Sequence, residues 1–347
     1  MTALRWERVH ERPTFPPSHL DTATLPLASM TQPLANQHIV VLLGGPSAER
    51  EVSLVTGAAY AAALERLGAR VSRVDPGPDI VQVLTALKPD AVFNGLHGRW
   101  GEDGCVQGVL ETLGLAYTHS GVLASALAMD KAKSKAVLAA AGIPVPGGGL
   151  YNRHDVARTH VMAPPYVVKP NAEGSSVGVF IVLEGANSPP RDLAAEGWAF
   201  GERVMVEPYV PGLELAVAVV GESNGPRALA VTEIRSSTGF YDYDAKYAEG
   251  GSVHVIPAPI PDAVRDRALR LAELGHASLG CQGVTRCDFR YDGINDLLAL
   301  LEVNTQPGMT PTSLVPEQAD HTGVSFDRLV LWILEDAYAR CSAGGTA

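Results

Sequence analysis

Apolar residues recur in short runs and amphipathic stretches from residue 39 onward. Ile39 to Leu43 is an apolar run that predicts a buried strand, and a glycine-rich turn follows at residues 44–47. The next stretch predicts a helix that ends at Gly68. Its expected buried face comprises Val52, Val55, Ala58, Ala59 and Ala62. The strand Ala91 to Asn94 and a helix after Asp103 repeat the alternation, which is typical of a small parallel α/β domain.

The pattern changes after the helix that ends near Gly142. Further runs read as strands: Tyr166 to Lys169, Gly178 to Val182, and Val204 to Glu207. A final amphipathic helix is expected from Phe326 to Tyr338. The fold class is therefore α/β followed by α+β, in four segments: a flexible extension (1–37), an N-terminal α/β domain (38–119), a central subdomain (120–206) and a C-terminal subdomain (207–347).

Residues 1–37 lack any helical or strand period and contain five prolines, which favours an extension without regular structure. Met30 is followed by threonine, as Met1 is, so translation that starts at Met30 is a hypothesis.

The overall composition excludes several classes of protein. The 347 residues carry 38 acidic and 27 basic side chains, a formal charge of -11, which argues against a nucleic-acid partner. The four cysteines form no CxxC pair, so neither a zinc cage nor a disulfide framework is expected. No apolar run reaches the roughly 18 residues of a membrane span, and no signal peptide is evident. We expect a cytoplasmic protein without a membrane partner.

Two neighbouring strands near the C-terminus carry acidic side chains in phase. In the strand Gly283 to Arg290, alternation places Arg286 and Asp288 on one face. In Leu297 to Asn304 it places Glu302 and Asn304 on one face, with Leu301 and Val303 on the other. A connecting loop centred near Asn295 would set Asp288 opposite Glu302, whereas a tight turn at Asp292-Gly293 would set it opposite Leu297.

Two carboxylates directly opposed across strands repel each other unless a cation lies between them. The oxygen ligands of Asp288, Glu302 and Asn304 suit magnesium or manganese. The alternative is a pair of solvated acids on an exposed sheet face.

Three other segments are candidates for chemistry. Residues 169–178 combine Lys169 with small residues and backbone donors, which suits phosphate binding, although such a loop is often a plain hairpin. His97 lies beside glycine at the end of a parallel strand, where α/β domains bind ligands. Residues 241–247 read as a surface loop, either a simple connection or a lid whose Lys246 reaches phosphate.

Seven segments, in order, carry a family resemblance: GGPSAEREVSL, LHGRWGEDG, MDK, VVKPNAEGSSVGV, YDYDAKY, RCDF and EVNTQPGMTPTSLVP. Together they resemble the D-alanine–D-alanine ligases of the ATP-grasp superfamily, from about Ile39 to the last helix. The resemblance implies an ATP-grasp fold with an N-terminal Rossmann-like domain. It also implies ATP-dependent joining of two D-alanine molecules through a D-alanyl phosphate, for peptidoglycan precursors, and a homodimer.

The resemblance further implies a role for each matching residue. The catalytic positions are Glu49, Ser175, Tyr247, Arg286 and Gly308. The substrate-binding positions are His97, Ser313 and Leu314, and the nucleotide-binding positions are Lys131, Lys169, Glu207, Glu214 and Lys246. Two Mg²⁺ or Mn²⁺ ions are expected on Asp288, Glu302 and Asn304, with ATP as co-substrate.

Some alternatives stay open. Relatives that make D-alanyl-D-lactate often carry Phe where this chain has Tyr247, which favours D-alanine as the second substrate over D-lactate or D-serine. Another ATP-grasp carboxylate–amine ligase is a further possibility. A nicotinamide dehydrogenase would need GxGxxG where the chain has Gly44 to Glu49. A non-catalytic nucleotide sensor would not need Glu49, Arg286 and the lid at residues 241–247 together.

Overall fold

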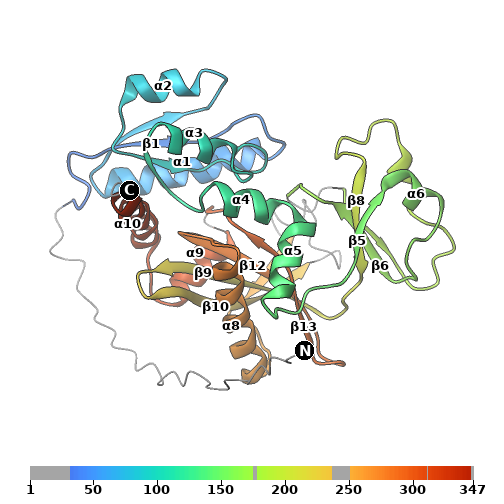
Figure 1. The fold of residues 1–347 in the computed structure, drawn as a ribbon. Helices are drawn as coiled ribbons and strands as arrows, with labels where there is room; N and C mark the ends of the chain where they lie inside the picture. Colours follow the sequence, from blue (N-terminus) through green and yellow to red (C-terminus); the bar gives the residue numbers. More distant parts are fainter. Residues whose placement is uncertain (1–31, 175–177, 237–250, 311, 345–347) are drawn as a thin grey trace, which may run out of the picture.

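The computed structural model of the chain describes residues 32–174, 178–236, 251–310 and 312–344. Figure 1 shows a body built from two stacked parts and a lobe that extends to one side of it. The upper part of the body carries β1 and α1–α3, the lower part carries the strands from β9 onward, and the lobe carries β5, β6, β8 and α6.

The first sheet is parallel, with the strand order β2-β1-β3-β4. Its strands are β1 His38–Leu42, β2 Arg70–Val74, β3 Ala91–Asn94 and β4 Ala116–Tyr117, and its helices are α1 Arg50–Arg66, α2 Ile80–Leu87 and α3 Cys105–Thr112. The prediction of a small parallel α/β unit is confirmed.

The predicted buried face of α1 is wrong. Val52 is buried, but Val55 is 53% exposed, and the helix instead turns Ser53, Thr56 and Gly57 inward. A Cβ on Gly57 would lie 2.4 Å from the Cβ of Leu43, so the glycine permits close packing of the helix on the chain after β1. The Ser53 hydroxyl donates to the carbonyl of Gly95 and accepts from the amide of Gly44. These hydrogen bonds offset the free-energy cost of burying the hydroxyl.

Of the predicted extension, residues 1–31 lie outside the described residues. Residues 32–37 belong to the fold, because Leu34 is 3% exposed and its amide donates to the carbonyl of Leu67. The hydroxyl of Tyr338 on the last helix also donates to the side-chain oxygen of Gln37.

Two helices connect the body to the lobe sheet, whose order is β5-β8-β6-β7 with antiparallel pairing. The helices are α4 Val122–Met129 and α5 Lys131–Ala140. The lobe contains β5 Gly149–Asn152, α6 Arg153–Arg158, β6 Tyr166–Pro170, β7 Phe180–Val182, the 3-10 helix Arg191–Ala194 and β8 Arg203–Pro208. The strands predicted in this region are confirmed.

The third sheet is antiparallel, with the order β11-β10-β9-β12-β13. Its strands are β9 Leu213–Glu222, β10 Gly225–Ser236, β11 Ser252–Val255, β12 Val284–Asp292 and β13 Leu297–Asn304. Helix α8 Asp262–Ser278 packs on the face that carries Val217 and Cys287. Leu314, the first residue of α9 Leu314–His321, packs on Ala216 of the opposite face, and α10 Phe326–Gly344 ends the described chain.

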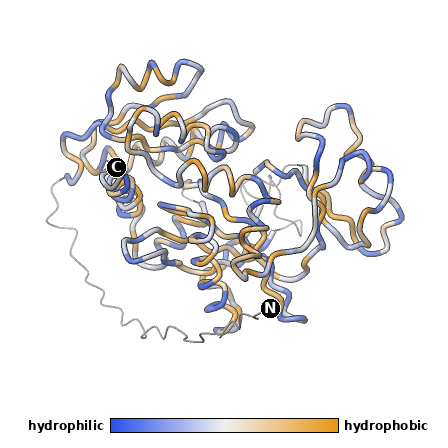
Figure 2. Tube along the Cα trace, viewed as in Figure 1, coloured by the Kyte–Doolittle hydropathy of each residue, from blue (hydrophilic) through white to orange (hydrophobic). Residues whose placement is uncertain are grey.

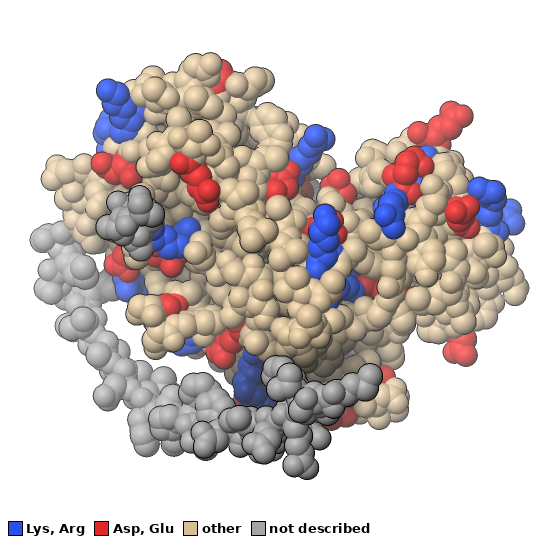
Figure 3. All heavy atoms as spheres, in the orientation of Figure 1, with Lys and Arg blue, Asp and Glu red and all other residues tan. Residues whose placement is uncertain are grey.

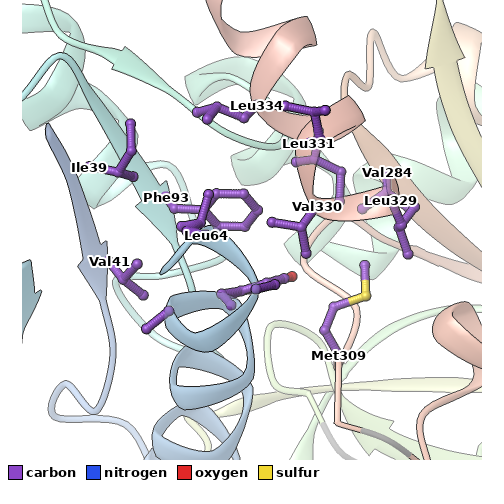
Figure 4. Close-up of a cluster of buried hydrophobic side chains, with 14 of the residues drawn as sticks. Ile39, Val41, Leu64, Phe93, Val284, Met309, Leu329, Val330, Leu331 and Leu334 are labelled. Carbon is purple, nitrogen blue, oxygen red and sulfur yellow. The ribbon is translucent and has the colours of Figure 1, made fainter. Parts of the chain in front are cut away.

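The parallel sheet and the antiparallel sheet share one hydrophobic core. Figure 4 shows Ile39, Val41 and Phe93 from the first sheet directed toward Leu329 to Leu331 and Leu334 on α10. Val284 of β12 belongs to the same cluster. The lobe has a separate core around Tyr166, Val168 and Val206. Figure 2 shows apolar segments in both parts of the body and in the lobe.

Candidate active site

A cleft lies between the lobe sheet and the β12–β13 hairpin. It comprises about 870 Å³ of space including its open mouth. Figure 3 shows the surface hollowed between body and lobe, with acidic and basic side chains interspersed on this face. The charged residues that line the cleft are Lys131, Lys169, Glu173, Glu207, Glu214, Asp288, Arg290 and Glu302.

A second cleft continues from the first toward the parallel sheet. The two share Lys131, Glu173, Gly174 and Glu302 as lining residues. The second cleft is also lined by Glu49, His97, Arg286, Asn304 and Gly308. The structure thus brings residues of the lobe sheet, of the third sheet and of the segments that follow β1 and β3 to one continuous site.

The register of the β12–β13 hairpin agrees with the loop centred near Asn295. Asp288 lies opposite Glu302, and Arg286 lies opposite Asn304. Asp292 pairs with Leu297, so the turn comprises residues 293–296. The alternative register, with Asp288 against Leu297, is excluded.

A β-bulge follows the two acids. Asp288 pairs with Glu302 while Phe289 pairs with Leu300, so Leu301 has no partner across the strands. The predicted place of Leu301 on the face opposite Glu302 is wrong, because Leu301 lines the same cleft as the acid. The extra residue interrupts the alternation on which the prediction depended.

Each of the opposed acids is paired with a cation. The Nε and Nη2 atoms of Arg286 donate to the two carboxylate oxygens of Asp288, both at 2.7 Å. The Nζ atom of Lys131 lies 3.2 Å from Oε2 of Glu302. These contacts offset the repulsion between the two carboxylates within the protein itself.

The donor atoms of the hairpin fit a hard divalent cation. The described part of the chain contains no group of three or more His, Cys, Asp or Glu residues arranged to hold a metal. The hairpin instead offers the Asp288 and Glu302 carboxylates and the Asn304 amide oxygen, which accepts one bond from the amide of Gln306 at 2.9 Å. Sites that use few protein oxygens and leave positions for phosphate or water are typical of magnesium.

One buried carboxylate joins two lysines at the lobe end of the cleft. The Nζ atom of Lys169 on β6 lies 2.6 Å from Oε1 of Glu207 on β8, and Lys135 on α5 contacts Oε2 of the same carboxylate. Burial would raise the pKa of Glu207, but the charges of Lys169 and Lys135 outweigh it and lower the pKa. Burial, reinforced by the Lys169 charge, lowers the pKa of Lys135 to about 8 despite its ion pair.

Sequence reasoning did not identify Lys135. It lies four residues after Lys131 on α5, and residues at this spacing share one face of a helix. That spacing was the one available signal, because the partner Glu207 lies 72 residues further along the chain.

The start of α5 is attached to the candidate phosphate loop. The backbone amide of Lys131 donates to the carbonyl of Asn171, and the amide of Ala132 donates to the Asn171 side chain, both at 3.0 Å. The Lys131 ammonium donates to the carbonyl of Glu173 at 2.7 Å. Asp130 caps the helix by accepting from the amide of Lys133. Lys131 is therefore held where the loop, the start of α5 and Glu302 of β13 meet.

Glu214 on β9 is accompanied by Arg290, a second residue that sequence reasoning missed. Nη1 of Arg290 lies 3.4 Å from Oε2 of Glu214, and its Nε donates to the carbonyl of Val210 at 3.1 Å. Its Nη2 donates to the hydroxyl of Tyr209 at 3.2 Å. Arg290 thereby ties the segment between β8 and β9 to the third sheet.

Glu49 and His97 lie together at the inner end of the second cleft. Glu49 is 8% exposed, and a Cβ on Gly98 or on Gly174 would lie 2.7 Å or 3.2 Å from its Oε2. His97 is 4% exposed and contacts the Thr56 hydroxyl at 3.1 Å through Nε2. Its Nδ1 lies 3.3 Å from a Glu102 oxygen, so both ring nitrogens have protein partners.

The segment between β13 and α9 contains Gly308 and Ser313, and α9 begins at Leu314. A Cβ on Gly308 would lie 3.2 Å from the Ser313 hydroxyl oxygen, so the two are adjacent. The Ser313 hydroxyl accepts from the amide of Thr310 at 3.0 Å. Leu314 is 4% exposed, and its side chain packs against Ala216 and Ile234. Three predicted site residues, Ser175, Lys246 and Tyr247, lie outside the described residues.

A buried pair of amides joins this segment to the first sheet. The side-chain nitrogen of Gln306 donates to the backbone carbonyl of Asn94 at the end of β3. The Asn94 side chain donates to Gln306 Oε1 at 3.4 Å and to the carbonyl of Gly101 at 3.0 Å. Both side chains are at most 1% exposed. The join fixes the strand end that precedes His97 relative to the residues that follow Asn304.

The fold and the site together define an ATP-grasp enzyme, in which a lobe sheet and a second antiparallel sheet enclose a cleft of lysines and paired acids. A solved D-alanine–D-alanine ligase from Bacillus anthracis complexed with ATP superimposes with a TM-score of 0.75 and 27% identity, over 89% of this chain and all of that one. The ligase from Coxiella burnetii gives a TM-score of 0.73 and 25% identity, over 89% of this chain and 96% of that one.

Sequence comparison identifies the particular family. Residues 138–335 match the family model of the D-Ala–D-Ala ligase C-terminus. A D-alanine–D-alanine ligase of a Caulobacter species is 88% identical over 316 residues, which are 91% of this chain and 98% of that protein. The ligase of Caulobacter vibrioides is 80% identical over 91% of this chain and 97% of its own length. The chain belongs to the D-alanine–D-alanine ligase family.

Proposed function

We propose that this chain uses ATP to join two D-alanine molecules into D-alanyl-D-alanine for peptidoglycan synthesis. The reaction passes through D-alanyl phosphate and releases ADP and phosphate. The observation that carries the proposal is the meeting of two clefts at Lys131 and Glu302, in a chain 88% identical to a D-alanine–D-alanine ligase. One cleft places Lys131 and Lys169 beside several acids and suits a nucleotide with its metal ions. The other ends at the buried Glu49 and suits an amino acid.

In this proposal the first cleft holds ATP. Lys131 and Lys169, together with Lys246, provide positive point charges for the phosphates. Glu207 and Glu214 accept hydrogen bonds from the adenine amino group and the ribose hydroxyls. The first cleft also has apolar lining residues, which support the placement of a planar base among them: Val167, Val179, Ile181, Val210 and Leu301.

Asp288, Glu302 and Asn304 would hold two Mg²⁺ or Mn²⁺ ions. Such ions, when bound, would supply positive charge that neutralises the negative charge developing on the phosphates. The pairing of Asp288 with Glu302 across adjacent strands supports this assignment.

The second cleft receives the amino acids. Glu49 pairs with the ammonium of the first D-alanine, and His97 lies beside it. Arg286 and the backbone amide of Gly308 donate to the oxyanion of the tetrahedral intermediate, a contribution of roughly 3 to 4 kcal/mol per donor. Ser313 and Leu314 contact the carboxylate of the second D-alanine through the hydroxyl and the backbone. Ser175 and Tyr247 complete the set by linking the phosphate loop and the lid to Glu49.

The proposed reaction has two steps. The carboxylate of the first D-alanine attacks the terminal phosphorus of ATP, and ADP departs. The neutral amine of the second D-alanine then attacks the carbonyl of the acylphosphate. The C–O bond to the phosphate breaks, and the proton released by the nitrogen leaves with the phosphate. The enzyme's part is to position the reactants and to stabilise negative charge, with water kept out of the site. We place this reaction in the cytoplasm, where ATP is available, and propose a homodimer.

Product analysis tests the proposal. The purified chain is incubated with ATP, Mg²⁺ and D-alanine, alone or with D-serine or D-lactate, and the products are separated by mass. We expect D-alanyl-D-alanine together with ADP release that depends on D-alanine. Failure to form the dipeptide would overturn the proposal. If D-alanyl-D-serine or D-alanyl-D-lactate forms in preference to the dipeptide, only the proposed identity of the second substrate changes.

A further inference from the structure

Helix α5 carries three lysines with different environments. The side chains of Lys131 and Lys135 are 10% and 7% exposed, whereas that of Lys133 is 74% exposed and pairs with Asp130 at 3.0 Å. Lys131 reaches the cleft directly. Lys135 does not line the cleft, so a role in the reaction must pass through a neighbour.

That neighbour is Glu207. The carboxylate lines the cleft, its side chain is 4% exposed, and its two oxygens contact Lys169 and Lys135 separately. The two lysines come from different elements, β6 and α5. Lys169 lines the cleft together with Glu207, whereas Lys135 contacts the carboxylate from behind.

The arrangement has a consequence when a nucleotide enters. Under the proposed function, Lys169 serves the phosphates, whose charge attracts its ammonium in competition with Glu207. A buried carboxylate left without a cation is unfavourable by several kcal/mol and takes up a proton instead. Among the described residues, the remaining cation in contact with Glu207 is Lys135.

We propose that Lys135 is a positioning residue that keeps Glu207 ionised and directed at the nucleobase while Lys169 serves the phosphates. An ionised carboxylate only accepts hydrogen bonds, so it selects a base that offers an amino group at the adenine position. A protonated Glu207 can also donate, and it therefore tolerates a base with a carbonyl there. Lys135 thus determines the preference for adenine over hypoxanthine nucleotides. This inference rests on the proposed function for the roles of Lys169 and Glu207.

The test compares Lys135→Met with Lys133→Met, which removes the same charge from the exposed face of the same helix. For Lys135→Met we expect the KM for ATP to rise at least about 10-fold and the KM for D-alanine to change less than about twofold, because the second cleft is untouched. The ratio of kcat/KM for ATP over inosine triphosphate should fall at least about fivefold. Lys133→Met should match the wild type in all three quantities.

A double-mutant cycle separates positioning from general destabilisation. If Lys135 acts through Glu207, the pair Lys135→Met with Glu207→Gln should be no worse than Glu207→Gln alone in KM for ATP. Additive effects would overturn the proposal, and so would an unchanged preference for ATP over inosine triphosphate in Lys135→Met.

Calorimetric binding of ADP and inosine diphosphate without D-alanine provides an independent readout, and Lys135→Gln replaces any variant that fails to fold. If the wild type makes no dipeptide, the proposed function fails. The ADP preference of wild type and variant still decides the role of Lys135. Loss of that preference in the variant supports the role, and an equal preference in both overturns it.

Discussion

A methyl group added at Gly98 tests whether Glu49 binds the first D-alanine. Gly98 follows His97 and has a φ of +65°, in the left-handed region. A Cβ built there would lie 2.7 Å from Oε2 of Glu49 and 3.2 Å from the hydroxyl oxygen of Ser47. The nearest obstacle is thus the far end of the side chain that the proposal places on the substrate ammonium.

The magnitude follows from these distances. Ordinary contact begins at 3.4 Å, so the Glu49 carboxylate must withdraw by about 0.7 Å to admit the methyl group. A misplacement of this order in a substrate-positioning group reduces catalysis by roughly 10- to 100-fold. Separately, an alanine at this left-handed φ lowers the free energy of unfolding by about 1 to 2 kcal/mol relative to glycine.

Gly114→Ala is the matched control, because Gly114 belongs to the same α/β unit, has a φ of +66° and has no heavy atom within 4 Å of its added Cβ. Both variants should lose similar stability in denaturant unfolding. Only Gly98→Ala should lose kcat/KM for the first D-alanine, with ADP affinity unchanged in calorimetry. Equal kcat/KM in the two variants would refute the placement of Glu49 at the substrate.

Three further predictions follow from the site and its supports. Glu302→Ala should lower kcat at saturating Mg²⁺ by roughly 100-fold or more while the protein stays folded by circular dichroism, and normal turnover would exclude the metal assignment. Burial lowers the pKa of His276 from 6.5 to about 4, so the unfolded state binds more protons between these values. As the pH falls from 6.5 to 4, the wild type should lose roughly 3 kcal/mol more of its unfolding free energy than His276→Gln does. Equal losses in the two proteins, measured by denaturant unfolding at both pH values, would contradict this. Gln306→Ala should lower the unfolding free energy by about 1 to 3 kcal/mol, because the buried Asn94 carbonyl loses its donor; an unchanged unfolding midpoint would show that the amide join is dispensable.

The β12–β13 hairpin shows what alternation in a sequence can and cannot predict. The shared face of Arg286 and Asp288, and their register against Asn304 and Glu302, follow from a period of two residues and a loop of suitable length. The bulge at Leu301 could not be predicted, because an inserted residue looks like any other apolar position until the partner strand is known.

Helix α1 shows a different limit. Apolar periodicity selected Val55 and Ala58 for burial, yet the helix buries Ser53, Thr56 and Gly57 instead. Small and hydroxyl side chains allow a helix to approach a strand closely when their polar atoms find backbone partners. Such burial depends on the neighbouring chain and leaves no hydrophobic signal.

The supporting residues of the first cleft are hard to find in the sequence for a related reason. Lys135 and Arg290 became recognisable once their partners, 72 and 76 residues away in sequence, were placed beside them. The family resemblance proposes residues for the ligands, and the structure adds the residues that contact and support those side chains.

The core shared by the parallel and antiparallel sheets limits how enzymes of this kind can be recombined. Phe93 from the first sheet and Leu329 and Val330 from α10 pack in one cluster, although more than 230 residues separate them in sequence. A hybrid that takes the N-terminal α/β unit from one parent and α10 from another would combine core side chains from two different proteins. Such side chains would pack poorly against each other. The lobe, with its own core around Tyr166, is the better unit to exchange.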